Sequence, residues 1–336
     1  MRSWIIRGFV LVGLIAALII FVKLGAIKTT GLSLQNPEVN LTVLATADLH
    51  GGIPAKLAEY IQEERIKDRN LILVDAGDFY DADNGDISSI PMRQWFNICG
   101  PNRSHQRRMS PIVRAMAKQG YDAVVLGNHE FVSNNKDYLD ELVLDFADCN
   151  IPVLSANLYT TLNNYKVNYV NPYIIKEVET DQGVVKVGIL GLTIKEVGES
   201  NGAKELKDLP QYKGTLELTD MVQEVNDKKW TECMRYNGAD IVIAVVHAGE
   251  ESAKFKNPGN RIKELAQSTN GIDAIVAAHT HVNIPEHRYK NKSGETVIVT
   301  QPGRYGQYCS KISFTLLKRD GKWDVIKKNS LTHKTS

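Results

Sequence analysis

The chain has 336 residues, of which 43% are hydrophobic and 24% are charged. These proportions are typical of a globular protein with ample apolar material for a core, so disorder of the whole chain is not expected. The 40 Lys and Arg residues nearly balance the 39 Asp and Glu residues. This balance argues against a protein that coats a polyanion, and no stable nucleic-acid partner is predicted.

The amino terminus differs from this average, because two arginines precede an uncharged apolar run at residues 8–22. A basic start followed by such a run is the form of a secretory signal, and residues 24–27 would lengthen it towards a membrane-spanning helix. We therefore expect residues 1–27 to be a signal peptide or a membrane anchor rather than a buried helix. Residues 28–40 are expected to be a polar linker. The rest of the chain is expected to lie outside the cytoplasm, secreted or held at the membrane by the N-terminal helix.

Four cysteines lie far apart in the chain and show no Cys-x-x-Cys spacing. They are Cys99, Cys149, Cys233 and Cys309. This spacing argues against a zinc knuckle or a thioredoxin-type site. Outside the cytoplasm one or two disulfides could form, but the sequence does not choose among the pairings, and ordinary buried thiols are the alternative.

Strands alternate with helices in both halves of the chain, with β-rich stretches between and after them. Strands are expected at residues 41–47, 70–75, 124–126, 152–158, 173–179, 184–193, 240–246, 272–278, 296–300, 311–318 and 323–327. Helices are expected at residues 54–67, 111–119, 136–148, 216–236 and 261–267. Residues 197–214 are expected to form a loop. This order predicts an α/β domain with more than one sheet.

Five of the expected strands end in residues that can bind a metal or transfer a proton. The strand ends are Asp48-x-His50, Gly77-Asp78, Gly127-Asn128-His129, His247 and His279-x-His281. Strand ends lie at the rim of a sheet, where α/β proteins tend to keep their sites. Residues two apart in extended chain point to the same side, so the pairs with this spacing are expected to converge.

Each strand end alone has an ordinary explanation, since Gly-Asp and Gly-Asn are common turns and a histidine can simply cap a strand. However, five of the eight histidines lie at these ends, which is not expected of scattered surface histidines. Imidazole and carboxylate ligands together suit zinc, manganese or iron better than calcium or magnesium. The series therefore predicts a metal site.

The same series of motifs resembles that of the calcineurin-like metallophosphoesterases, and within them the catalytic domain of the 5′-nucleotidase and 2′,3′-cyclic-nucleotide phosphodiesterase group. The resemblance covers about residues 41–318 and includes the stretches 154–157, 187–193 and 301–306. It implies a four-layer α/β/β/α sandwich, with two β-sheets flanked by helices. This sandwich would form a single catalytic domain over residues 41–333.

The resemblance also implies two divalent metal ions, which would be manganese, zinc, iron or cobalt. The ligands that it assigns are Asp48, His50 and His281 for one ion, Asn128, His247 and His279 for the other, and Asp78 as the bridge. Only two of these ligands are carboxylates, so the centre would stay positive and attract a phosphate. The implied reaction is the in-line attack of a metal-bound hydroxide on a nucleotide-type phosphoester.

His129 would be the catalytic group that is not a ligand, beside Asn128, and would protonate the leaving oxygen or stabilise the transition state. In the relatives an aspartate three residues further on orients this histidine, whereas this chain has Val132 there. Glu130, Asp81 and Asp83 are the candidates to replace it.

A second departure concerns the carboxy-terminal domain, which in two-domain nucleotidases supplies aromatic rings for the base and arginines for the phosphate. The chain continues for only about thirty residues after Tyr305, so this domain is expected to be absent. The irregular segment 91–110, which contains Trp95 and Arg103, would either cover the metal cleft or form a solvated surface loop.

The leading interpretation is an extracytoplasmic binuclear metal phosphoesterase, like a 5′-nucleotidase or a 2′,3′-cyclic phosphodiesterase, that acts on small nucleotide-like phosphoesters. One alternative is a phosphodiesterase acting on a sugar-nucleotide, a lipid headgroup or a cell-envelope ester. An alternative of another class is a catalytically weak binding or scaffold protein that retains the fold.

Overall fold

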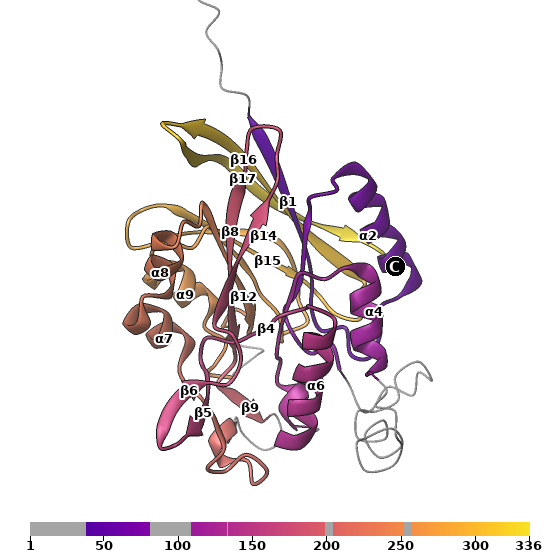
Figure 1. The fold of residues 1–336 in the computed structure, drawn as a ribbon, viewed down its shortest axis with the longest axis vertical. Coiled ribbons are helices and arrows are strands. Elements are labelled where there is room, and N and C mark those ends of the chain that lie inside the picture. The colour runs from indigo at the N-terminus through magenta and orange to yellow at the C-terminus, as the bar shows by residue number, and fades with distance from the viewer. Residues whose placement is uncertain (1–37, 81–108, 133, 199–203, 252–256) are drawn as a thin grey trace, which may run out of the picture. The chain divides into compact units, whose positions relative to one another are not determined.

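A computed structural model describes residues 38–80, 109–132, 134–198, 204–251 and 257–336 (Figure 1). The expected N-terminal helix at residues 1–27 lies outside this range, as do Cys99 and most of the segment 91–110. No helix of the described part combines the length and the apolar composition that crossing a membrane requires. The other three cysteines are free thiols, and Cys309 is buried.

Six strands form the first sheet, in the order β17-β16-β1-β2-β3-β4. They are β1 (Val39–Thr46), β2 (Ile72–Asp75), β3 (Ala123–Val125), β4 (Val153–Leu154), β16 (Tyr308–Arg319) and β17 (Lys322–Lys334). Neighbours from β1 to β4 are parallel, whereas β16 is antiparallel to both β1 and β17. The carboxyl ends of β1, β2 and β3 therefore meet at one edge.

The second sheet also has six strands, in the order β14-β15-β13-β12-β8-β7. They are β7 (Tyr173–Val178), β8 (Val185–Thr193), β12 (Ile241–His247), β13 (Ala274–Val276), β14 (Asn283–Lys290) and β15 (Thr296–Pro302). The four central strands are parallel, and β7 and β14 are antiparallel edges. The carboxyl ends of β12 and β13 therefore also lie together.

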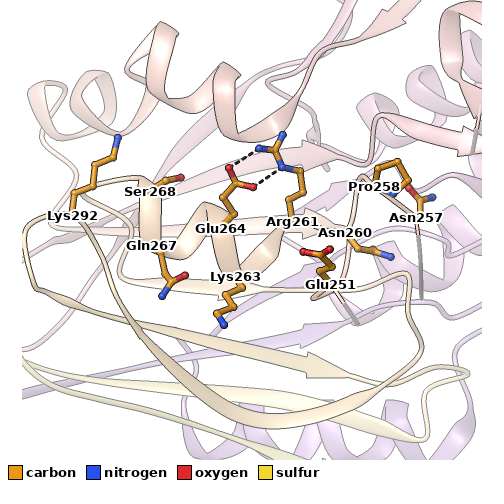
Figure 2. Close-up of a pocket in the computed structure, with 10 residues that line it drawn as sticks. All are labelled: Glu251, Asn257, Pro258, Asn260, Arg261, Lys263, Glu264, Gln267, Ser268 and Lys292. Atoms are coloured by element: carbon orange, nitrogen blue, oxygen red, sulfur yellow. Dashed lines mark hydrogen bonds and ion pairs between the residues drawn. The ribbon is translucent and has the colours of Figure 1, made fainter. Parts of the chain in front are cut away.

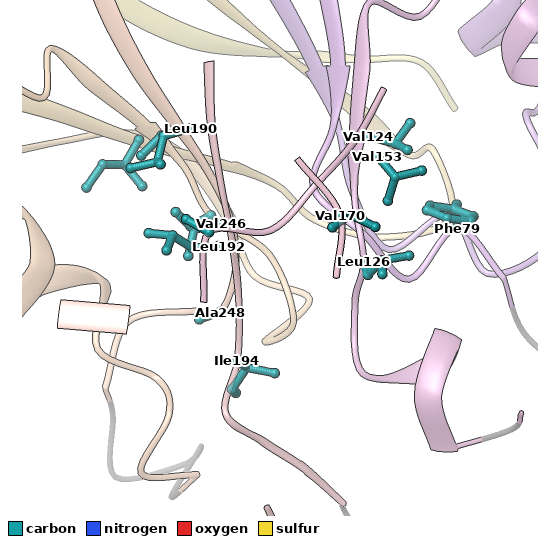
Figure 3. Close-up of a cluster of buried hydrophobic side chains, with 14 of the residues drawn as sticks. Phe79, Val124, Leu126, Val153, Val170, Leu190, Leu192, Ile194, Val246 and Ala248 are labelled. Carbon is teal, nitrogen blue, oxygen red and sulfur yellow. The ribbon is translucent and has the colours of Figure 1, made fainter. Parts of the chain in front are cut away.

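The strands of both sheets are buried on both faces, one against the other sheet and one against the helices. Ile189 of β8 belongs to the same buried cluster as Val43 of β1 and Val74 of β2, so one face of each sheet packs against the other. The next residue of β8, Leu190, belongs to the cluster on the helix side (Figure 3). Strands buried on both faces lose the polar alternation of surface strands, which explains their continuous apolar runs.

Helices lie on both sides of the paired sheets (Figure 1). On the side of the first sheet lie α2 (Ala55–Lys67), α4 (Pro111–Gln119) and α6 (Lys136–Asp148), and on the side of the second lie α7 (Met221–Lys228), α8 (Trp230–Tyr236) and α9 (Ile262–Ser268). α4 starts with a proline, which needs no hydrogen bond there, and ends at Gly120 with φ +73°. The predicted mixed α/β fold with more than one sheet is confirmed.

The strand predicted at residues 152–158 is divided in two. After β4 the chain leaves the first sheet, and β5 (Leu158–Leu162) joins β6 (Tyr165–Asn168) and β11 (Leu216–Leu218) in a three-stranded sheet. The buried Asn157 side chain lies at this break and is bonded to the backbone of β8. It accepts from the backbone N–H of Thr193 at 2.9 Å and donates to that residue's carbonyl at 2.7 Å.

The helix predicted at residues 216–236 is also wrong in its bounds. It begins as β11, and α7 and α8 are separated by Lys229, which adopts a left-handed φ of +53°. The predicted loop at residues 197–214 contains β9 (Glu196–Gly198), β10 (Lys204–Glu205) and the 3-10 turn η1 (Leu206–Asp208). β14 was not predicted, because an exposed edge strand such as this one carries few apolar residues.

Candidate metal centre

All five predicted strand ends meet where the two sheets pack together. The candidate residues follow β1 (Asp48, His50), β2 (Asp78), β3 (Asn128), β12 (His247, its last residue) and β13 (His279, His281). Asp48 joins the two sheets directly, because its carboxylate accepts from the backbone N–H of His279 at 3.1 Å. The parallel strand order therefore gathers residues that are up to 233 positions apart in the sequence.

A first group of possible metal ligands comprises Asp48, His50, Asp78 and His281, whose ligand-type atoms all lie within 4.8 Å of one another. The Nε2 atoms of His50 and His281 are 3.0 Å apart, and His281 Nε2 is 3.5 Å from Asp48 Oδ1. The two aspartates and His50 are buried, whereas 29% of the His281 side chain is exposed. The group is therefore open to solvent on the His281 side.

A second group shares Asp78 with the first and adds His247 and His279. Asn128 Oδ1 lies 3.0 Å from His247 Nε2 and 2.9 Å from His279 Nδ1, so Asn128 belongs to it as well. His247 Nδ1 is 2.8 Å from the carbonyl of Ala76. Because a carbonyl only accepts, Nδ1 carries a hydrogen, and Nε2 is the ring atom that a metal ion would meet.

The backbone at these positions is unusual. Asp48, His50, Asp78, His279 and His281 all have positive φ, between +48° and +69°. Few residues other than glycine adopt this left-handed conformation, and it concentrates at functional sites. The reasoning from extended chain was therefore wrong, although the residues that it paired do converge. They converge because the chain turns sharply at each of them.

Two glycines leave room for this convergence. A Cβ atom on Gly127 would lie 2.2 Å from Asp78 Oδ1, and a Cβ atom on Gly77 would lie 2.6 Å from the backbone nitrogen of Gly127. Gly77 also has a φ of +94°, which side chains rarely allow. A side chain on Gly127 would displace Asp78, and one on Gly77 would displace the Gly127 backbone or the His247 ring.

Glu130 stabilises the turns at Asp78 and Gly127 through their backbone. Its buried carboxylate accepts from the backbone N–H of Gly127 at 2.6 Å, of Asp78 at 3.0 Å and of Tyr80 at 3.1 Å. Burial, and then the charge of Asp78, raise the pKa of Glu130. Glu130 thus holds the backbone of these turns, and which residue takes the place of an aspartate at Val132 stays a prediction. Sequence reasoning missed this role, because only the fold brings the three amides together.

His129 lies beside the two groups rather than within them. Its backbone N–H donates to Asp78 Oδ1 at 2.8 Å, and its ring meets His50 edge to face with centroids 4.8 Å apart. Its side chain is 20% exposed. Asp81 and Asp83, the other two candidates to orient His129, lie outside the described residues.

The electrostatics of the site favour bound positive charge. Burial alone would raise the pKa of Asp78, but the neighbouring His247 outweighs it and holds this pKa below its usual range. Burial likewise disfavours protonation of His247, and Asp78 overcomes that effect and raises its pKa. Asp78 therefore stays ionised among these histidines, which a carboxylate must be to bind a metal. Imidazole nitrogens, carboxylates and an amide oxygen form a donor set that suits zinc, manganese or iron.

The turn between β15 and β16 also reaches the site. Tyr305 has a φ of +55°, donates its backbone N–H to the Asp48 carbonyl at 2.8 Å, and places its ring 5.4 Å from that of His50. Arg304 lies over this ring and places Nη1 3.2 Å from His281 Nδ1. Sequence reasoning assigned neither residue to the site, although flanking glycines mark the turn.

A surface cavity of about 990 Å³ lies elsewhere, along α9 (Figure 2). Lys263, Gln267 and Lys292 are among its lining residues, and none of the candidate ligands is. The Arg261 guanidinium in its wall is already paired with Glu264 (Figure 2). The candidate metal ligands therefore lie at the strand ends and not in this cavity.

Comparison with known proteins gives a consistent result. The calcineurin-like phosphoesterase family model matches residues 41–283. The trifunctional nucleotide phosphoesterase YfkN of Bacillus subtilis is 29% identical over 315 residues, which cover 86% of this chain and 20% of that protein. A 2′,3′-cyclic-nucleotide 2′-phosphodiesterase/3′-nucleotidase of Yersinia enterocolitica is 24% identical, with 89% of this chain and 46% of the relative covered.

Solved structures agree in fold. The crystal structure of the calcineurin-like phosphoesterase YfkN from Bacillus subtilis aligns with a TM-score of 0.71 and 27% identity, and the match covers 89% of this chain and 92% of that one. The Haemophilus influenzae NAD nucleotidase aligns with a TM-score of 0.62 and 22% identity over 89% of this chain and 58% of its own. The chain spans about half the length, or less, of the curated relatives that it matches.

Proposed function

The chain belongs to the calcineurin-like phosphoesterase family, and from this premise we propose that it is a metal-dependent hydrolase of nucleotide-type phosphoesters. The observation that carries the proposal is the convergence of two groups of ligand-type atoms that share Asp78. The names of its relatives, which include nucleotidases and cyclic-nucleotide phosphodiesterases, support the substrate class. Its placement outside the cytoplasm remains a prediction from residues 1–27.

The proposal assigns two divalent ions to the site. The assigned ligands are Asp48, His50 and His281 for one ion, and Asn128, His247 and His279 for the other, with Asp78 between them. When bound, such ions activate water and neutralise the charge of a phosphate. Asn128 contributes to this by its neutrality, because it leaves only two carboxylates in the site and so preserves net positive charge for the substrate.

His129 is proposed to protonate the leaving oxygen. Its position supports this role, because it lies next to the shared Asp78 and its side chain is partly exposed to solvent. A general acid must come within hydrogen-bond distance of the atom that it protonates. A histidine in this role must therefore be accessible to a substrate that enters from solvent. The role would be wrong if His129→Ala left the hydrolysis rate of every ester unchanged.

The test is to strip the full chain of metal and reload it with manganese, zinc or cobalt. Hydrolysis is then measured with 5′-mononucleotides, 2′,3′-cyclic nucleotides and simple diesters. We expect turnover to require about two equivalents of metal and to be lost in Asp78→Asn. A protein that binds two metal ions but hydrolyses none of these esters would favour a binding or scaffold protein instead.

A further inference from the structure

We propose that Arg304 binds the phosphate oxygens of the substrate at the open side of the metal centre. This inference rests on the proposed function and adds to it a residue that recognises the charge of the substrate. Three features of the molecule support it: the placement of Arg304, the rigidity of its turn and the hydrogen bonding of His281.

Arg304 lies at the only ligand of the first group that is appreciably exposed. Its Nη1 is 3.2 Å from His281 Nδ1, while Nε2 of the same ring faces His50 and Asp48. A substrate that approaches the first group from solvent meets His281 and Arg304, because the other three members of that group are buried. The guanidinium is thus positioned at the entrance to the cluster.

The turn that carries Arg304 is held firmly on three sides. Tyr305 donates its N–H to Asp48, and the carbonyl of Gly306 accepts from the hydroxyl of Thr335. Gly306 also packs so closely that a Cβ atom there would lie 2.8 Å from Pro54 Cδ. Tyr305 has a left-handed backbone conformation, which is unfavourable for a residue with a side chain. Such a conformation persists only where the surrounding structure enforces it.

The Tyr305 ring supports the guanidinium itself. The Cζ atom of Arg304 lies 4.9 Å from the centroid of that ring, within the range of a cation–π interaction. In the described part of the chain no carboxylate forms an ion pair with Arg304. The side chain is exposed and its fork of donors is not neutralised by an acid, which is the state that suits a phosphate.

Metal binding by His281 would remove the hydrogen-bond acceptor that this ring offers to Arg304. Nδ1 of His281 can accept from Arg304 only when it carries no hydrogen. If Nε2 is used as a metal ligand, as its direction suggests, the hydrogen of the neutral ring must be on Nδ1. Two donors would then face each other, and Arg304 would need a different acceptor. Phosphate oxygens are the acceptors that the proposed substrate brings to this place.

The test compares Arg304→Gln with wild type, both loaded with manganese. Binding of inorganic phosphate is measured by calorimetry, and KM and kcat are measured with a nucleoside 5′-monophosphate and a nucleoside 5′-diphosphate. We expect phosphate binding to weaken by about 10- to 100-fold, with a matching rise in KM and little change in kcat. Arg304→Lys keeps the charge but not the fork, and should recover part of the affinity.

Arg319→Gln is the matched control. It removes the same charge from an exposed side chain at the far end of β16, paired there with Asp324, so it should leave both readouts unchanged. Metal content and unfolding temperature of all variants should equal those of wild type.

The two substrates distinguish whether Arg304 binds the reacting phosphate or a neighbouring one. A loss with both substrates assigns Arg304 to the reacting phosphate, and a loss with the diphosphate alone assigns it to a neighbouring phosphate. Equal phosphate affinity and equal KM values in Arg304→Gln and wild type would overturn the inference while leaving the proposed function intact. Absence of turnover in wild type would refute the proposed function, and the phosphate-binding comparison would still decide the role of Arg304.

Discussion

Glu130 stabilises the site through the backbone. Its carboxylate is the acceptor for three amides, including those of Gly127 and Asp78. Glu130→Ala would leave these buried donors without a partner, so we expect the free energy of unfolding to fall by about 3 kcal/mol or more. Urea unfolding of the metal-free protein measures this. Glu63→Ala, on the exposed side of α2, is the control and should change stability by less than about 0.5 kcal/mol.

The same experiment has a functional readout. If Glu130 holds the turns that carry Asp78 and Asn128, Glu130→Gln should also weaken metal binding, since it keeps the size of the side chain but replaces one acceptor oxygen with a donor. Unchanged stability and metal affinity in both variants would show that the turns form without it.

Asp75 gives a prediction about pH. It is fully buried in β2, where its carboxylate accepts from Thr46 Oγ1 and from the backbone N–H of Gly77, and burial raises its pKa to about 8. The folded state therefore retains a proton that the unfolded chain loses at about pH 4. The stability that this proton confers is complete below that pH and is lost as pH rises to about 8.

The size of this effect follows from linkage. A proton bound only in the folded state lowers the free energy of unfolding by about 1.4 kcal/mol for each pH unit between about pH 4 and pH 8. Asp75→Asn cannot ionise, so its stability should depend less steeply on pH by about that amount. Urea unfolding of both metal-free proteins at pH 5, 6 and 7 tests this. Parallel pH profiles would show that Asp75 does not hold the proton.

At the scale of elements, the break between α7 and α8 is set by one residue. Lys229 has a φ of +53° and a ψ of +40°, a conformation that costs about 1 kcal/mol for a residue with a Cβ atom. Its ion pair with Glu232 is exposed and contributes little. We therefore expect Lys229→Gly to stabilise the protein by about 0.5–1 kcal/mol.

The preceding lysine is the matched control for this prediction. Lys228 is the last residue of α7, so Lys228→Gly should destabilise the protein by up to about 1 kcal/mol. Thermal unfolding of the two variants should therefore shift in opposite directions. Shifts of the same sign would mean that the helix break does not depend on the left-handed residue.

At the scale of the whole molecule, the proposed metal centre joins the two sheets. Its proposed ligands follow β1, β2 and β3 on one side and β12 and β13 on the other, so bound metal should stabilise the entire fold. At a free metal concentration of about 100 times the dissociation constant, the gain is about 2.7 kcal/mol for each site. We expect manganese or zinc to raise the unfolding temperature of chelator-treated protein by several degrees.

Asp78→Asn tests this coupling, because Asp78 belongs to both groups of ligands. The variant should lose most of the metal-dependent shift in unfolding temperature. Asp324→Asn, which changes a half-exposed carboxylate on β17, should keep all of it. An equal shift in the two variants would indicate that the metal binds elsewhere.

Much of the site was predictable because its signals are local. An apolar run that stops at Asp48, His247 or His279 can be read without knowing the fold, and the order of such ends led to a resemblance that the family match confirms. The bounds of α4 and α6 were predicted to the residue for the same reason, since proline, glycine and helical periodicity act over a few positions. The division of the predicted strand 152–158 at Asn157 was not predicted, because its hydrogen-bond partner Thr193 lies 36 residues away.

The sequence by itself therefore determined the kind of chemistry, since residue types at strand ends set which atoms can bind a metal. Only the tertiary structure decided how those atoms meet. The turns at Asp48 and Asp78, the amides of Asp78 and Tyr80 on Glu130, and the position of Arg304 beside His281 all depend on contacts between segments far apart in the chain. Such contacts form only once the sheets have assembled, and no local pattern in the chain encodes them.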